Sequence, residues 1–126
     1  MNKRADIIKY LTNELSKAEN QHKDNMEHIN DNFLFYFAWR AEETYVLAYI
    51  AHEITMMLNT LNEKTDLDLT TYFGRVKESY IDRLTTRPVI ESSSSHTHNI
   101  CSLWSTQARQ QLLKKVNQCL EILFAE

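Results

Sequence analysis

The chain has 126 residues, enough for one hydrophobic core and too few for two ordinary domains. It is 43% apolar and 25% charged, as globular proteins are, and its net charge of −3 lacks the positive surplus that attracts nucleic acid or anionic lipid. A single glycine and a single proline argue against β-sandwiches, barrels, Rossmann folds and P-loops, which depend on these residues in turns and phosphate loops. We therefore expect an all-α, four-helix, bundle-like protein, with residues 1–126 forming a single helical domain.

The first predicted helix covers about residues 3–29. Its apolar residues recur every three or four positions, which is the spacing of one helical face: Ile8, Leu11, Leu15 and Ala18. The following stretch, 17–27, is almost entirely polar, so we expect it either to protrude beyond the core or to contain a turn. Residues 30–32, Asn-Asp-Asn, are helix-capping types and indicate a break before Phe33. The alternative is one unbroken helix, because Asn and Asp are tolerated inside helices at a modest cost.

The second predicted helix, about residues 32–63, is the dominant element. At 1.5 Å per residue it would be about 48 Å long, so we expect either the first helix or a second copy of the chain to pack along it. Its expected core stripe is Phe33, Phe37, Arg40 or Ala41, Thr44, Leu47 or Ala48, Ala51, Ile54, Leu58 and Leu61.

Seven consecutive apolar residues, 33–39, open this helix. Successive helical residues are 100° apart, so these side chains surround the helix, and such a helix is expected to be buried on all sides. Either the bundle core or a subunit or partner interface satisfies this requirement. We expect Phe33 and Phe37 to face the core, and we assign Phe35, Tyr36 and Trp39 to a candidate partner-binding surface, because aromatic residues are enriched at interface cores.

Arg40 and Glu43 complete the candidate partner-binding surface. Arg40 lies within the apolar stripe and Glu43 follows it by nearly one turn. A cation in such a place is rarely unpaired. We expect Arg40 to pair with Glu43 or another helix, the alternative being a carboxylate of a ligand or partner.

Two further helices are predicted, at about 68–85 and 102–124. Asp66 or Asp68 is expected to cap the third helix, and Gly74 inside it suggests either close approach of another helix or a break. Arg87-Pro88 and four successive serines predict a flexible loop at 86–99. The stripe of the last helix is Trp104, Ala108, Leu112, Val116, Cys119 or Leu120, and Leu123.

The sequence shows no catalytic constellation and no cofactor motif. His96, His98 and Cys101 have the spacing most suggestive of a metal site, but it matches no standard zinc module. The Glu-x-x-His pattern of di-iron bundles and the HExxH of zinc proteases are both missed around His52, where Tyr49 and Met56 occupy the required positions. We therefore expect no catalytic residue, metal or cofactor.

These observations favour a non-enzymatic protein–protein interaction module. A small cytoplasmic inhibitor, immunity protein, adaptor or regulator would act through an aromatic and acidic helical surface, on a protein partner, as a homodimer, or both. The absence of a secretory signal and of a long apolar run predicts no membrane association. We expect neither a nucleic acid nor a small-molecule substrate. The alternatives are a helical-bundle enzyme or metal protein, and a nucleic-acid-binding regulator that uses Arg109, Lys114 and Lys115 of the last helix.

Overall fold

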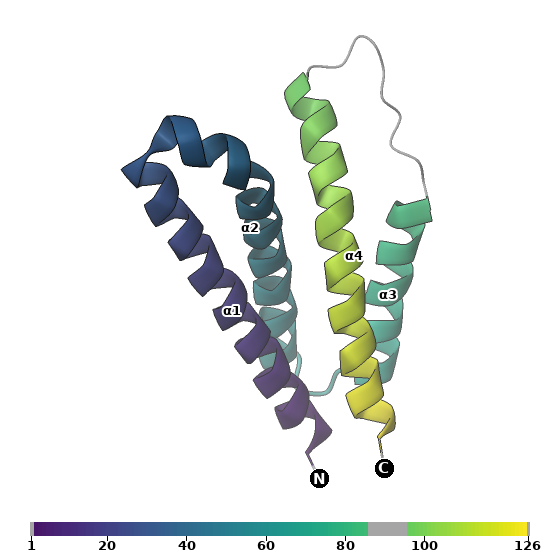
Figure 1. Ribbon diagram of the computed structural model, residues 1–126. Helices are drawn as coiled ribbons and strands as arrows, with labels where there is room; N and C mark the ends of the chain where they lie inside the picture. The colour runs from purple at the N-terminus through teal and green to yellow at the C-terminus, as the bar shows by residue number, and fades with distance from the viewer. Residues whose placement is uncertain (1, 86–95, 126) are drawn as a thin grey trace.

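The computed structural model describes residues 2–85 and 96–125, with residues 96–101 described by their backbone alone. All regular structure in these ranges is helical, and it forms four helices that pack as a bundle (Figure 1). Their bounds are α1 Lys3–Asp31, α2 Phe33–Glu63, α3 Leu69–Thr85 and α4 His96–Phe124. The predicted fold class is confirmed.

Helices α1 and α2 form a long antiparallel hairpin, so the first helix does pack along the second. One residue, Asn32, separates them. Its side-chain oxygen accepts a hydrogen bond from the Phe35 amide at 3.3 Å, and its own amide donates to the His28 carbonyl at 3.1 Å. A single side chain therefore caps the start of α2 while its backbone closes the end of α1. The predicted break is confirmed, and the polar stretch 17–27 continues α1 without a turn.

Helices α3 and α4 form the second antiparallel pair, which packs against the first mainly through α2 and α4. Of the two residues expected to cap α3, Asp68 does so: its carboxylate accepts hydrogen bonds from the Thr70 and Thr71 amides. Helix α4 begins at His96, six residues earlier than the predicted start, because no proline or glycine between 96 and 101 stops it. The predicted loop is therefore too long at its C-terminal end, and the rest of it, 86–95, lies outside the described residues.

One core joins all four helices. Its residues repeat at three- and four-residue spacing along each helix, so one face of each points inward. The predicted stripe of α4 is confirmed, because its four central members are all fully buried. The buried core comprises Ile7, Leu11, Ala18, Val46, Ile50, Ile54, Met57, Leu61, Phe73, Tyr80, Ala108, Leu112, Val116 and Cys119.

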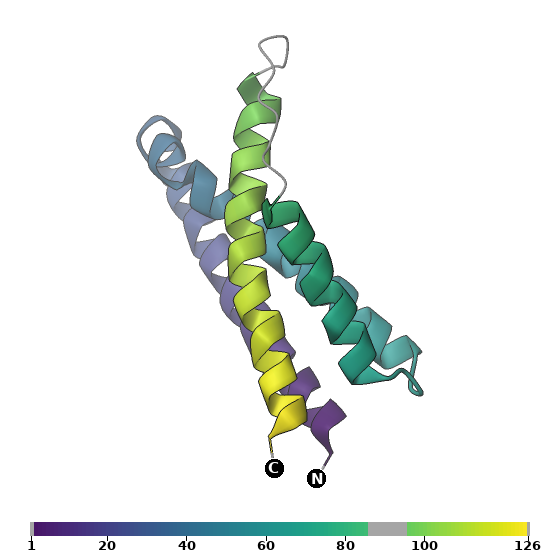
Figure 2. The ribbon, with the colours of Figure 1, turned by 90° about the vertical axis from the view of Figure 1, so that its right-hand side faces the viewer.

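The chain ends meet at one end of the bundle (Figure 2). Lys3 donates hydrogen bonds to the carbonyls of Ile122 and Ala125. Arg4 donates to the carbonyls of Leu61, Lys64 and Thr65. Its guanidinium thus places a positive charge at the C-terminal end of α2, where the helix dipole favours one. The opposite end, where α1 turns into α2, stands apart from α3 and α4 in both views.

Gly74 lies in the middle of an unbroken α3. A methyl group added there would meet no atom within 4 Å, and its backbone has no positive φ. The two explanations predicted for this glycine, close approach of another helix and a break in α3, are therefore both wrong.

Candidate protein-interaction surface

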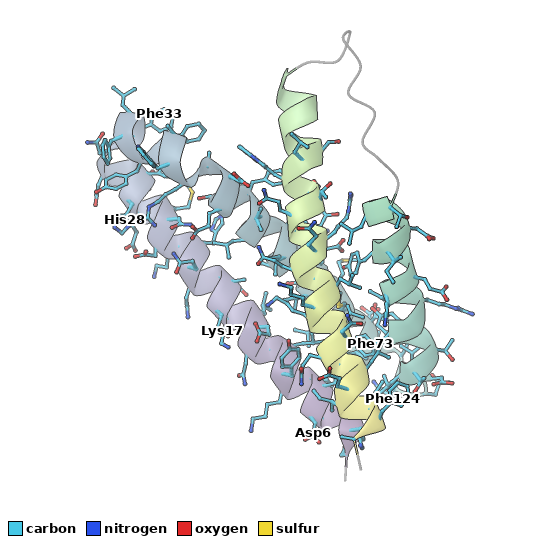
Figure 3. All side chains as sticks on the ribbon, turned by 45° about the vertical axis from the view of Figure 1, so that its right-hand side comes forward. Asp6, Lys17, His28, Phe33, Phe73 and Phe124 are labelled. Carbon is cyan, nitrogen blue, oxygen red and sulfur yellow. The ribbon has the colours of Figure 1, made fainter. Side chains whose placement is uncertain are left out.

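The first two turns of α2 expose five large apolar side chains. The exposed fractions are 89% for Leu34, 77% for Trp39, 58% for Phe33, 56% for Phe35 and 48% for Phe37. We call these five residues the aromatic tip. Figure 3 shows Phe33 at the far end of the α1–α2 hairpin, distant from Phe124 at the opposite end of the bundle.

Phe33 and Phe37 are exposed, which contradicts the prediction that they face the core. Their rings stack on each other with centroids 4.9 Å apart. The spacing correctly places them on one side of the helix, but that side has no apolar surface opposite it. The neighbouring end of α1 is largely polar, and the hairpin turn lies to one side of α4, apart from it in both views.

Phe35, Tyr36 and Trp39 lie together on the hairpin, as the sequence placed them. The Phe35 ring meets Tyr36 edge-on at 5.1 Å between centroids and lies 6.4 Å from Trp39. Tyr36 is half-buried, because its ring also packs edge-on against His28 of α1 at 5.3 Å. Tyr36 thereby joins the exposed aromatic rings to α1.

A polar network lies beneath the aromatic tip and is centred on Asn25 of α1, which is itself fully buried. Its side-chain oxygen accepts hydrogen bonds from Arg40 at 2.6 Å and Gln21 at 3.2 Å. Its amide nitrogen donates to the Glu43 carboxylate at 3.0 Å. The network fixes α2 against α1 by satisfied polar contacts just below the aromatic residues.

Arg40 and Glu43 are thus brought together through Asn25. The Arg40 guanidinium also lies over the Tyr36 ring, 5.9 Å from its centroid. The candidate partner-binding surface predicted from the sequence contains both charged residues but not Asn25. The sequence does indicate that Asn25 is buried. It follows the buried Leu11 and Ala18 at successive intervals of seven residues, and this spacing places all three on the same helical face.

A groove begins beside the aromatic tip and runs between α2 and α4. Its volume is about 470 Å³, and Trp39 and Glu43 belong both to its lining and to the predicted partner surface. The remaining lining residues are Glu42, Val46, Leu47, Gln107 and Gln111. A partner seated on the aromatic tip would therefore find a mixed polar and apolar channel next to it.

Charge is distributed unevenly along the chain. Residues 20–43 contain five acidic side chains and two basic ones, a local net charge of −3, so the remaining residues sum to zero. No charged residue lies between Phe33 and Trp39. The aromatic tip is therefore an uncharged surface with acidic surroundings.

Metal binding and thiol reactivity are the other candidate chemistries in the described part of the chain. Within it, no three His, Cys, Asp or Glu side chains come together as a metal site requires. The side chains of His96, His98 and Cys101 lie outside the described residues. Burial raises the pKa of the Cys119 thiol to about 12, so this cysteine is a core residue rather than a nucleophile.

The basic residues of α4 are largely engaged with other helices. Arg109 donates a hydrogen bond to the Tyr49 hydroxyl at 3.3 Å and lies over its ring. Lys115 forms an ion pair with Glu14 of α1 at 2.8 Å. Of the three cations in the predicted nucleic-acid cluster, two therefore hold the bundle together.

None of the helices in residues 2–85 and 96–125 is long and apolar enough to cross a membrane. No protein-family model, curated protein or solved structure matches the chain.

Proposed function

We propose that this protein is a non-enzymatic protein–protein interaction module whose working surface is the aromatic tip. It would serve as a small inhibitor, immunity protein, adaptor or regulator. The observation that carries this proposal is the exposure of five large apolar side chains at one projecting end of the molecule.

The size of the surface supports this role. An aromatic side chain contributes about 150–250 Å² of surface. Summed over all sides of the helix, the exposed fractions given above amount to roughly 600 Å² of apolar area, which equals the upper end of the range for the largest patch on a monomeric protein. Patches of this size commonly mark interaction sites.

The contacts that hold the start of α2 against α1 also favour binding of a partner at the aromatic tip. Aromatic anchors bind well when they are held in place before the partner arrives, because less conformational entropy is lost. Tyr36 packs on His28, and Asn25 holds the Arg40 and Glu43 side chains. The start of α2 is thus attached to α1 by both ring packing and hydrogen bonds.

Site-specific photocrosslinking tests the proposal. A photoreactive phenylalanine derivative replaces Phe35 in one variant and Phe124 in a matched control, in the cells that produce the protein. Phe124 is 68% exposed and lies at the opposite end of the bundle. We expect covalent protein adducts from position 35 at several times the yield from position 124. Equal yields from the two positions would contradict the proposal.

A further inference from the structure

We infer that the aromatic tip is the interface of a homodimer, in which the tip of a second copy of this chain covers it. This inference rests on the proposed function and names the partner. Its first support is the apolar character of the surface. From Phe33 to Trp39 the exposed side chains carry no charge, and four of the five exposed large residues are aromatic.

Apolar character separates lasting association from transient association. Transient interfaces are only about as apolar as the rest of a protein surface, whereas homodimer interfaces are more apolar, about 65% of their area. An uncharged aromatic surface therefore fits a permanent partner. A second copy is the one partner that is made with the chain and at the same concentration.

The available area matches what a stable dimer requires. With homodimer interfaces about 65% apolar, roughly 600 Å² of apolar surface corresponds to an interface of about 900 Å² per partner. A stable interface of standard size buries about 800 Å² per partner. A second copy that covers the aromatic tip on all its sides would therefore form an interface of standard size.

The shape of the tip indicates what covers it. Apolar side chains surround the start of α2, whereas one partner helix covers only a stripe along its side. A second hairpin tip brings two helix ends, the start of its own α2 and the end of its α1, where Met26 is 38% exposed. Two tips packed about a two-fold axis would cover more of the aromatic residues than a single helix.

The acidic surroundings oppose this dimer only weakly. They lie outside the uncharged segment, and exposed charges are screened beyond about 8 Å at physiological ionic strength. Because the two copies carry charge of the same sign near the interface, added salt should strengthen the dimer. A basic partner protein would show the opposite salt dependence.

Sedimentation equilibrium of the full chain over about 1–100 µM, the range of micromolar affinity, tests this inference. We expect the wild type to have twice the monomer mass of 14.9 kDa. Leu34→Glu places a charge in the interface from a side chain that is 89% exposed in the folded chain, so it leaves the fold intact. It should weaken the dimer by at least about 100-fold, because a buried unpaired charge is strongly unfavourable.

Trp39→Ala provides an uncharged variant, and we expect it to weaken association by about 30-fold or more. Phe124→Glu and Phe124→Ala, at the far end of the bundle, are the matched controls and should leave the dimer unchanged. Raising the salt concentration should tighten wild-type association.

Three results would overturn the inference: a wild-type monomer throughout the range, a dimer that resists Leu34→Glu, or a dimer equally weakened by the Phe124 variants. Failure here is distinguishable from failure of the proposed function. A monomer that still gives adducts from position 35 has a different protein on its tip, whereas the absence of any tip-specific adduct removes both proposals.

Discussion

Asn25→Ala removes the fully buried side chain on which the polar network beneath the aromatic tip depends. Three hydrogen bonds disappear, one each with Gln21, Arg40 and Glu43. A hydrogen bond to a charged group contributes about 1.5–3 kcal/mol to stability and a neutral one about 1 kcal/mol. The substitution therefore tests whether this network stabilises the hairpin.

The solvent exposure of each residue that bonds to Asn25 determines how much stability the substitution removes. Glu43 and Gln21 are exposed, so water replaces most of what Asn25 gives them. Arg40 is half-buried, and its bond to Asn25 is the shortest of the three at 2.6 Å. We expect a loss of about 3 kcal/mol in the free energy of unfolding, most of it from Arg40. For a chain of this length that corresponds to a fall in Tm of about 12 °C.

Urea denaturation followed by circular dichroism measures the change, with all variants at one protein concentration because association adds to apparent stability. Asn20→Ala is the matched control: it makes the same substitution in the same helix at an exposed position. Both variants gain the same helix propensity, so their difference isolates the network. The control should stay within about 0.5 kcal/mol of wild type. An Asn25→Ala variant no less stable than Asn20→Ala would refute the stabilising role of the network.

Three further predictions concern the rest of the bundle. Gly74→Ala should raise the free energy of unfolding by about 1 kcal/mol, since the added methyl meets no atom within 4 Å; a destabilised variant in urea denaturation would contradict this. The hydrogen bond from Lys115 lowers the pKa of the Glu14 carboxyl below its usual 4.5. The ion pair therefore contributes its full stability at pH values above 4.5, and this contribution is lost as the pH falls through the lowered pKa of Glu14. Urea denaturation at a series of pH values should show that the free energy of unfolding of the wild type falls in this range, and that it falls less in Lys115→Met. In the control Lys17→Met, which removes a lysine that is 75% exposed, the fall should be nearly the same as in the wild type. In a Cys101→Ser background, Cys119 should react with a disulfide reagent at about pH 8 only when the chain unfolds, because burial raises its pKa to about 12; rapid labelling of the folded protein would contradict its assignment to the core.

Periodicity predicted the buried face of α4, but of the five buried residues of α2 the predicted stripe contained only Ile54 and Leu61. The stripe Ala108, Leu112, Val116 and Cys119 is buried as expected, because three- and four-residue spacing determines which side chains share a face. The same is true of the junction at Asn32, where side-chain capping is a local interaction.

Prediction failed where the outcome depends on what another helix presents. Phe33 and Phe37 share a face, but their spacing contains no information on the polar end of α1 beside them. Asn25 was missed for the converse reason. A polar residue type suggests exposure, and only the positions of Arg40 and Glu43 on α2 make its burial favourable.

The placement of polar and apolar residues supports association at the aromatic tip. Between the two hairpins, partly buried polar side chains pair with each other: the Tyr45 and Ser105 hydroxyls lie 2.9 Å apart, and Lys115 meets Glu14. At the projecting end of the first hairpin, uncharged aromatic side chains face outward instead. An isolated monomer gains little stability from exposed side chains that its own helices do not cover, and it risks nonspecific aggregation through them. Covering them with a second tip would transfer that apolar area out of water, so dimerisation would stabilise the fold as well as form the interface.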